Sequence, residues 1–301
     1  MKIGRAAWLT DTGRRRVRNE DAYVFEPPLF AIADGMGGAR AGEVAAGIAA
    51  AALRDGKRDV IDEASLEAII EEANRRVWER SVADPSTAGM GTTITVAFVD
   101  ANAAQVVFGH VGDSRAYRLR GDALEQVTTD HSLVAELVRS GVLTPEEAER
   151  HPQRSAITRA VGTERAIEVD VFTVPAELED LVLLCSDGLT DMLSEDEIAA
   201  AIVGAERDPA AAADALVAAA NAQGGEDNIT VVLFELVDGE PETDPEPERV
   251  TDAEPTGAAA PETVADVRTH GAGPGGRLMS LGLIAVIVVV GLLALYWGIS
   301  R

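Results

Sequence analysis

Apolar residues along this chain occur in two kinds of run, and each kind predicts a different element of secondary structure. Short runs that are rich in valine, isoleucine and leucine predict β-strands. Longer runs, in which alanines and larger apolar residues recur every three or four positions, predict helices. The expected strands cover residues 3–9, 22–25, 29–33, 92–99, 105–110, 115–120, 169–174, 181–185 and 229–237. The expected helices cover residues 39–53, 64–81, 132–140, 145–150, 195–203 and 209–222.

The strands within residues 92–120 follow one another closely, and the last two are joined through the turn that begins at Gly112. Such spacing predicts an antiparallel meander, because parallel neighbours need a long crossover connection. Ser132 and Thr144 each precede a helical run, so we expect them to be N-caps. The polar residues 151–162 show neither period, and we expect a mobile flap there.

The composition changes after the last expected strand. Residues 238–277 are rich in proline, glycine, alanine and acidic residues and predict a disordered acidic linker. Residues 278–299 carry no charged side chain, and Tyr296 and Trp297 lie near their end. At about 1.5 Å per residue, a helix of this length matches a hydrocarbon core about 30 Å thick, so we expect a single transmembrane helix. The globular domain is then expected to cover residues 1–237.

Net charge and cysteine content narrow the class of protein. The formal net charge is −25 at pH 7, which would repel phosphate backbones, so we expect no nucleic-acid partner. The acidity fits both a need for solubility and a high-salt environment. The single cysteine, Cys185, excludes an intramolecular disulfide, and its apolar strand predicts a buried, unreactive thiol. We expect His110, which ends another strand, to be a structural histidine rather than a catalytic base.

Acidic residues recur beside the ends of the predicted strands, at Asp34, Asp187, Asp227 and the pair Glu20 and Asp21. A single aspartate and glycine after a strand most often form an ordinary turn, so the recurrence is the informative feature. Asp34 is followed by a glycine-rich turn, which lets backbone groups approach an ion or a phosphate closely. A cluster of carboxylates would suit Mg²⁺ or Mn²⁺, and the chain has no cysteine and histidine set for zinc.

Six short motifs make this pattern specific. In chain order they are Arg16-Val17-Arg18-Asn19-Glu20-Asp21, Asp34-Gly35-Met36-Gly37-Gly38, Gly91-Thr92-Thr93, Gly112-Asp113-Ser114-Arg115, Asp187-Gly188-Leu189-Thr190-Asp191 and Gly225-Glu226-Asp227-Asn228-Ile229-Thr230. This ordered series resembles that of the metal-dependent protein phosphatase 2C family, over residues 3–237. Residues 151–159 are similar to the flap segment of the bacterial members of that family.

The resemblance implies an α+β fold, a four-layer α-β-β-α sandwich of two antiparallel sheets flanked by helices, to which this chain would add a C-terminal transmembrane helix. It also implies a protein-serine/threonine phosphatase, a phosphoric monoester hydrolase with two Mn²⁺ or Mg²⁺ ions and a third ion at a weaker site. Two such ions would activate a water for in-line attack on the phosphate, without a covalent enzyme intermediate.

The resemblance also implies the role of each residue at the main site. Asp34 would bridge both metals, and the carbonyl oxygen of Gly35 would bind one of them. Asp187 and Asp227 would bind the other metal. Arg16 would orient the phosphate, because a guanidinium group pairs with two phosphate oxygens at once.

Five further residues have a less direct part in this scheme. Glu20 and Asp21 would act through metal-bound waters or through hydrogen bonds to the ligands. Asp113 and Asp191 resemble the ligands of the third metal, with Ser155 of the flap as a contributor. Two alternatives stay open, since Asp113 also suits the chemistry of its turn and Asp191 also suits the cap of the following helix.

Four arginines within residues 14–18 form a basic patch on an acidic chain. A solvated loop is one interpretation, and a phosphate clamp is the other. The resemblance assigns only Arg16 to the phosphate and leaves Arg14, Arg15 and Arg18 as accessory or merely exposed residues.

One position departs from the family pattern. Some relatives have a histidine, assigned as the general acid, where this chain has Met36. A methionine cannot donate a proton, so a metal-bound water would protonate the leaving group, or the group would leave unaided.

These features together predict a membrane-tethered serine/threonine phosphatase of the cell membrane. We expect its catalytic domain in the cytoplasm, because the N-terminus lacks the apolar core of a signal peptide. The expected partners are the lipid bilayer and phosphorylated proteins, including a membrane Ser/Thr kinase and its substrates. One alternative is a catalytically inactive, phosphoprotein-binding scaffold of the same fold, although every acid of the motifs is present. Another is a phosphatase dedicated to one phosphorylated signalling factor.

Overall fold

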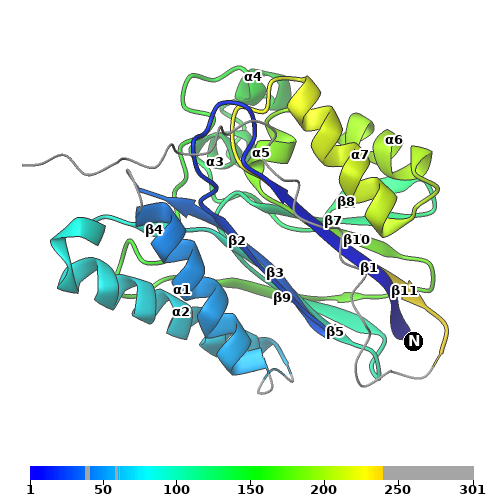
Figure 1. Ribbon diagram of the computed structural model, residues 1–301, viewed down its shortest axis with the longest axis horizontal. Coiled ribbons are helices and arrows are strands. Elements are labelled where there is room, and N and C mark those ends of the chain that lie inside the picture. Colours follow the sequence, from blue (N-terminus) through cyan, green and yellow to red (C-terminus); the bar gives the residue numbers. More distant parts are fainter. Residues whose placement is uncertain (38–40, 58–59, 61, 240–301) are drawn as a thin grey trace, which may run out of the picture. The chain divides into compact units, whose positions relative to one another are not determined.

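The computed structural model describes residues 1–37, 41–57, 60 and 62–239, and Figure 1 shows the course of the chain. Its strands form two antiparallel sheets. The first sheet consists, in spatial order, of β1 (Lys2–Asp11), β11 (Ile229–Val237), β10 (Leu181–Cys185), β7 (Arg115–Arg120) and β8 (Ala123–Gln126). The second consists of β2 (Asp21–Glu26), β3 (Leu29–Met36), β5 (Ile94–Asp100), β6 (Gln105–Val111) and β9 (Asp170–Pro175), and the short β4 (Gly91–Thr92) pairs with β3.

The described residues also form helices. In chain order they are α1 (Ala41–Gly56), α2 (Glu63–Ala83), the 3-10 helix η3 (Pro85–Thr87), α3 (Leu133–Arg139), α4 (Pro145–Glu149), α5 (Asp187–Thr190), α6 (Glu195–Gly204) and α7 (Pro209–Ala222). Helices α1 and α2 contact the second sheet, whereas α6 and α7 contact the first (Figure 1). The alanines of α1 and α7 that face the sheets are buried, which allows close approach of helix and strand.

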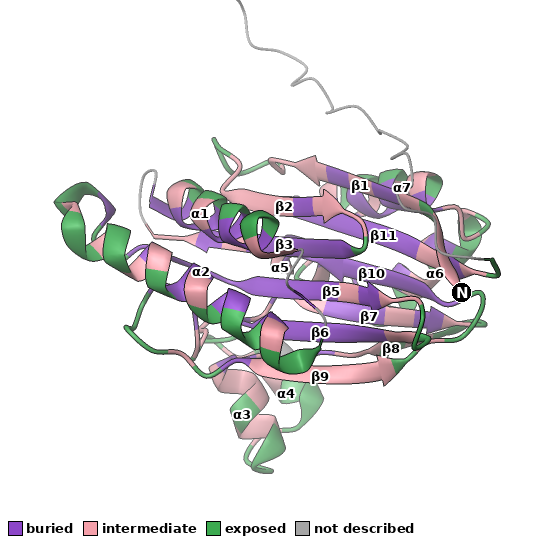
Figure 2. Ribbon diagram, turned by 90° about the horizontal axis from the view of Figure 1, so that it is seen from below, coloured by how far each residue is buried: buried purple, intermediate pink, exposed green. Residues whose placement is uncertain are grey.

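Three clusters of buried apolar side chains pack the sheets and helices against one another as layers. One cluster lies between the two sheets and contains Phe30 and Phe234, whose rings stack with centroids 4.3 Å apart. A second cluster joins the second sheet to α1 and α2, and a third joins the first sheet to α6 and α7. Figure 2 shows the central strands as largely buried and the outward faces of the helices as exposed. The predicted four-layer α-β-β-α sandwich is therefore confirmed for the described residues.

The expected meander is only partly right. Strands β5 and β6 do pair, but β6 lies in the second sheet and β7 in the first. The turn at Gly112 therefore carries the chain from one sheet to the other. Its φ of +115° and its approach to Thr93, where a Cβ would lie 2.5 Å from the side chain, explain the glycine. A short connection looks the same in the sequence whether it closes a hairpin or crosses between sheets.

Most of the other predicted elements are confirmed, with bounds that differ by a few residues. Three short elements, η3, β8 and α5, were not expected. The strand predicted at residues 92–99 is interrupted at Thr93, where β4 ends and β5 has not begun. Ser132 caps α3, and Thr144 forms a capping box with Glu147, as expected. Within residues 151–162 the structure has only turns, bends and single bridges, and the predicted mobility stays a prediction.

Cys185 and His110 are both buried, as expected. Burial raises the pKa of the Cys185 thiol to about 12, which leaves it protonated and unreactive at neutral pH. His110 Nδ1 lies 3.0 Å from the hydroxyl of Thr95. Burial and the neighbouring His131 lower the pKa of His110 to about 4, so the ring stays neutral.

The predicted membrane helix, residues 278–299, lies outside the described residues, as does the predicted linker from residue 240 onward. Among the residues that the structure describes, no helix is both long and apolar enough to cross a membrane.

Candidate active site

The two acids of the second sheet stand side by side. Asp21 begins β2, Asp34 lies near the end of β3, and their Cα atoms are paired in the antiparallel register. The hydroxyl of Thr92 donates a 2.8 Å hydrogen bond to the carbonyl oxygen of Asp34. The backbone N–H of Asp34 donates in turn to the hydroxyl of Thr93, at 2.9 Å. Thr92, the last residue of β4, and Thr93, which lies between β4 and β5, thus position the backbone of Asp34.

Asp187 comes from the first sheet and faces the same region. It follows β10 through Ser186 and is the first residue of α5. The next residue, Gly188, packs against the backbone just before β11. A Cβ at Gly188 would lie 2.0 Å from the carbonyl oxygen of Asn228. Only glycine permits this approach, and it holds α5, and with it Asp187, close to the strand that Asp227 precedes.

Asp21 is held by the first sheet although it belongs to the second. Its Oδ2 accepts a 2.9 Å hydrogen bond from Ser186 and a 2.6 Å bond from the hydroxyl of Thr230. Its Oδ1 is buried and has no hydrogen-bond partner among the described residues. Burial, which outweighs these two hydrogen bonds, raises the pKa of Asp21 to about 6.

Burial and mutual repulsion of these carboxylates together determine the electrostatics of the site. Burial, followed by the charges of Asp21 and Asp187, raises the pKa of Asp34 well above its ordinary value. Burial, followed by the charges of Asp113 and Asp227, does the same for the pKa of Asp187. Several negative charges therefore share a region with little water, an arrangement that stabilises a fold only when a cation offsets them.

Asp227 forms an ion pair with Arg16. Arg16 Nη2 lies 2.6 Å from Asp227 Oδ2, and the backbone N–H of Asn228 donates to Asp227 Oδ1 at 2.8 Å. Burial lowers the pKa of Arg16, but the charges of Asp227, Asp187 and Asp34 outweigh it and raise that pKa overall. The guanidinium group of Arg16 therefore lies within the field of the acid cluster.

Asn228 ties the acid cluster to the loop between β1 and β2. Its side-chain oxygen accepts from the backbone N–H of Glu20 at 2.8 Å. Its side-chain nitrogen donates to the carbonyl oxygens of Thr12 and Arg18, at 3.0 and 2.9 Å. The sequence placed Asn228 within a motif but indicated no anchoring role, and its only signal was the position next to Asp227.

Gly35 lies where three backbone segments meet. A Cβ at Gly35 would lie 2.3 Å from the carbonyl oxygen of Gly42 and 2.5 Å from that of Glu20. A Cβ at Gly42 would lie 2.7 Å from Glu20 Oε2. These contacts place the Glu20 side chain beside the start of α1 and explain both glycines. Met36, which follows, pairs with Gly91 of β4.

The residues predicted for a third metal are only partly brought together. The charges of Asp130 and Asp191 act on Asp113, whose pKa is raised to about 6, chiefly by burial. Asp191 is the C-cap of α5 and lies 3.8 Å from Arg154 of the flap. The alternative that it caps the next helix is wrong, because Ser194 caps α6. Ser155 is exposed, with no side-chain hydrogen bond in the described part of the chain.

The donor set fits a divalent cation. As the side chains stand, no group of three or more His, Cys, Asp or Glu residues in the described ranges is arranged to hold a metal ion. Two buried carboxylate oxygens, Asp21 Oδ1 and Asp187 Oδ1, nevertheless have no partner there. With the raised pKa values of Asp34 and Asp187, they mark uncompensated negative charge that a cation would satisfy through oxygen ligands.

Comparison with known proteins agrees with this geometry. The family model of protein phosphatase 2C matches residues 14–222. Serine/threonine phosphatase stp of Listeria innocua is 42% identical over 242 residues, which cover 76% of this chain and 95% of that protein.

Solved structures agree as well. The crystal structure of the Mycobacterium tuberculosis serine/threonine phosphatase PstP/Ppp has a TM-score of 0.74 and 38% identity, and the match covers 78% of this chain and 100% of that one. The catalytic domain of PstP in complex with two manganese ions has a TM-score of 0.72 and 36% identity, over 78% of this chain and 99% of that one. Sequence and fold therefore show together that this chain belongs to the protein phosphatase 2C family of serine/threonine phosphatases.

Proposed function

We propose that this phosphatase hydrolyses phosphoserine and phosphothreonine side chains of proteins, with Mn²⁺ or Mg²⁺ ions held by its acid cluster. The observation that carries the proposal is the close approach of the carboxylates of Asp21, Asp34 and Asp187. Two of their buried oxygens have no partner among the described residues. Arg16 lies near enough for the charges of Asp34 and Asp187 to act on it. The PstP catalytic domain, which shares the fold, was solved with two manganese ions.

Four residues would hold the two main ions. Asp34 would contact both, Gly35 would offer its carbonyl oxygen to one, and Asp187 and Asp227 would bind the other. When bound, the ions would lower the pKa of a water, which would lose a proton and become a nucleophile for phosphorus, and they would offset the charge of the phosphate.

The remaining predicted residues have supporting parts in this proposal. Glu20 and Asp21 would orient the ligands, which agrees with the hydrogen bonds that fix one oxygen of Asp21. Asp113 and Asp191, with Ser155 as a contributor, would form the weaker third site.

Arg16 would bind the phosphate through its guanidinium group. Its 2.6 Å contact with Asp227 keeps the group at the edge of the acid cluster, where about half of the side chain is exposed. A dianionic phosphate, like a carboxylate, offers two oxygens to a guanidinium group, and it carries more negative charge. Arg16 can therefore exchange Asp227 for the phosphate.

No protein side chain is proposed as general acid. Met36 cannot donate a proton, and His110 is buried with its Nδ1 against Thr95. The leaving serine or threonine oxygen would therefore take its proton from solvent within the site.

Membrane tethering and opposition to a kinase also belong to this proposal. The apolar residues 278–299 support a single span in the cell membrane, with the catalytic domain (residues 1–237) in the cytoplasm. The acidic residues 238–277 would act as a linker between them. An anchored enzyme would be concentrated near membrane-bound phosphoproteins, such as a Ser/Thr kinase and its substrates.

The test is hydrolysis of a phosphothreonine peptide by the full chain with Mn²⁺, with EDTA, and after Asp187→Ala. We expect activity that needs the metal and falls at least about 100-fold in the variant. Asp196→Ala, which removes an exposed acid of α6, is the matched control and should leave activity unchanged. If the protein is folded and binds Mn²⁺ but has no activity, the proposed phosphatase function is contradicted, and the phosphoprotein-binding scaffold is favoured.

A further inference from the structure

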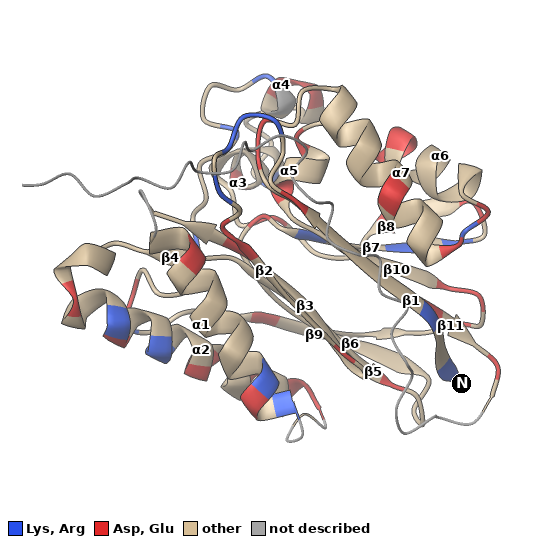
Figure 3. Cartoon of the chain, viewed as in Figure 1, with Lys and Arg blue, Asp and Glu red and all other residues tan. Residues whose placement is uncertain are grey.

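The loop between β1 and β2 exposes five consecutive side chains next to the acid cluster. We call residues 14–18 the arginine loop, and Figure 3 shows blue along much of the loop between these strands. All five residues are exposed, and Val17 is 95% exposed, more than the other large apolar residues of the described chain. A side chain this exposed buries almost no apolar area within the fold, so it remains accessible to a ligand.

The charges of the arginine loop are only half compensated. Arg16 pairs with Asp227 at 2.6 Å, and Arg15 lies 3.5 Å from Glu226. Arg14 and Arg18 have no carboxylate partner within the described residues. Two free guanidinium groups therefore flank Arg16 on a chain whose formal net charge is −25.

The base of the arginine loop is fixed although its side chains are exposed. The backbone N–H groups of Arg14 and Arg15 donate to the carbonyl oxygen of Gly225, at 2.7 and 3.2 Å. Asn228 donates to the carbonyl oxygen of Arg18 at 2.9 Å. Gly13, at φ +78°, approaches Asp227 so closely that a Cβ would lie 2.1 Å from its carbonyl oxygen. Because the backbone of the loop is already fixed, a ligand that binds its arginines would cost little backbone entropy.

We propose that Arg14 and Arg18, with Val17 between them as an apolar contact, bind the substrate peptide on both sides of the phosphorylated residue and select acidic flanking residues. The inference rests on the proposed function, because it takes the phosphate to lie on Arg16 of the same loop. An extended peptide advances about 3.3 Å per residue, so carboxylates within about three positions of the phosphoresidue are in reach of long arginine side chains.

The experiment compares three phosphothreonine peptides that differ only in flanking residues, which are glutamate, alanine or lysine. The full chain is assayed with Mn²⁺ as wild type and as the double variant Arg14→Glu and Arg18→Glu. Para-nitrophenyl phosphate, which has no flanking residues, reports the chemistry alone. The matched control is Arg165→Glu, an exposed arginine on a loop beside α2, where it borders Glu71 and Trp78.

We expect wild-type kcat/KM to be highest for the glutamate peptide and lowest for the lysine peptide, with the difference shrinking at high salt. The double variant should lose about 10-fold or more in kcat/KM for the glutamate peptide, mainly through KM, and reverse the order of the peptides. Hydrolysis of para-nitrophenyl phosphate should stay within about twofold, and Arg165→Glu should change neither substrate. The milder pair Arg14→Gln and Arg18→Gln should show the same order of effects at smaller size.

Three results would overturn the inference. Equal losses for all three peptides would mean that the loop supports the fold or the phosphate but does not read the flanks. A weaker affinity of the double variant for anionic phosphatidylglycerol vesicles, with unchanged affinity for neutral phosphatidylcholine vesicles and an unchanged peptide order, would mean that the loop meets a lipid surface. Absence of para-nitrophenyl phosphate hydrolysis by the wild type would overturn the proposed function itself, and with it this inference.

Discussion

Ser186 donates a 2.9 Å hydrogen bond to Oδ2 of Asp21, and this bond joins the end of β10 in the first sheet to the start of β2 in the second. Thr230 of β11 donates to the same oxygen at 2.6 Å. The other oxygen, Oδ1, is buried with no partner among the described residues. The fold thus orients a carboxylate through one oxygen and leaves the other for a ligand.

Replacing Asp21 by asparagine is expected to stabilise the metal-free protein. Burial raises the pKa of Asp21 from 3.8 to about 6, so above pH 6 the folded state holds a charge that the unfolded chain carries more easily. The gain in the free energy of unfolding should be absent near the unfolded pKa and should develop as pH rises from about 4 to about 6. At pH 7 it should reach about 3 kcal/mol, which is the difference between the two pKa values at about 1.36 kcal/mol per unit. Urea unfolding in EDTA across this range measures it.

The control for this prediction is Asp196→Asn, which alters an exposed acid of α6 and should show no such pH dependence. In saturating Mn²⁺ the order should reverse, because the wild type alone keeps the full charge that the cation requires. A gain at Asp21→Asn that is the same at pH 4 and pH 7 would contradict the electrostatic explanation.

Ser186→Ala is expected to weaken both the fold and the metal site. The hydroxyl accepts from the backbone N–H of Thr230 at 2.9 Å while it donates to Asp21, so its loss leaves a buried donor without a partner. We expect a loss of about 1–3 kcal/mol in urea unfolding and a higher Mn²⁺ concentration for half-maximal activity. The control is Ser140→Ala, which removes an exposed hydroxyl that donates to the carbonyl oxygen of Leu137. It should change neither the free energy of unfolding nor the Mn²⁺ concentration for half-maximal activity. A stability loss with an unchanged Mn²⁺ requirement would show that Ser186 is structural alone.

Arg16→Ala is expected to reduce kcat/KM about 10- to 100-fold, for para-nitrophenyl phosphate as well as for peptides. Charge-assisted hydrogen bonds to a phosphate contribute about 1.5–3 kcal/mol, which corresponds to a change of about 10- to 100-fold. The alanine also leaves Asp227 without its guanidinium partner. Arg16→Lys should recover only part of the loss, since an ammonium group cannot pair with two oxygens in one plane. Steady-state kinetics at fixed Mn²⁺ measure both variants. Full recovery by lysine would mean that Arg16 supplies charge without the paired geometry.

The acids of the site could be predicted from the sequence because each lies beside one end of an apolar run. Asp34 follows the apolar run 29–33, although β3 continues through it to Met36, and Asp187 follows β10 after Ser186. A carboxylate at such a point is expected at the edge of the core. In the structure the two carboxylates lie close enough for the charge of Asp187 to act on Asp34. Their strong mutual repulsion is also a consequence of that placement.

The partners of these acids could not be predicted in the same way. Ser186 and Thr230 reach Asp21 from the opposite sheet, more than a hundred residues away in the chain. Their role depends on which strand ends meet across the two sheets, and strand periodicity contains no such information. The crossing at Gly112 was misread for the same reason, because local spacing does not specify the sheet in which the next strand pairs.

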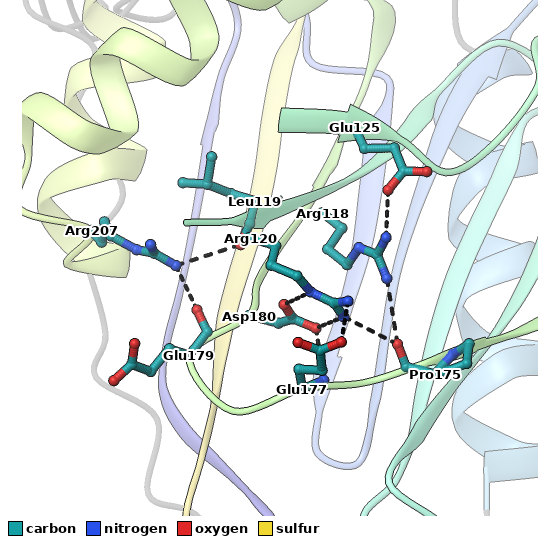
Figure 4. Close-up of polar contacts among 9 residues, drawn as sticks. All are labelled: Arg118, Leu119, Arg120, Glu125, Pro175, Glu177, Glu179, Asp180 and Arg207. Carbon is teal, nitrogen blue, oxygen red and sulfur yellow. Dashed lines mark hydrogen bonds and ion pairs between the residues drawn. The ribbon is translucent and has the colours of Figure 1, made fainter. Parts of the chain in front are cut away.

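Asp180→Ala is expected to destabilise the protein without slowing catalysis. Figure 4 shows Asp180 at the start of β10, the end opposite Asp187, with both of its oxygens on Arg120 at 2.8 and 2.7 Å. The Asp180 side chain is 1% exposed, so its removal leaves a guanidinium group without its buried partner. We expect a loss of about 2–4 kcal/mol in the free energy of unfolding, measured in urea.

The matched control in the same cluster is Glu177→Ala. Glu177 also contacts Arg120, at 2.5 Å, but its side chain is 64% exposed, so water replaces it and the expected loss is below about 1 kcal/mol. Both variants should keep kcat for para-nitrophenyl phosphate within about twofold at a temperature where they remain folded. A large fall in kcat at Asp180→Ala under those conditions would mean that the two ends of β10 are coupled. Equal destabilisation by both variants would instead contradict the role of burial.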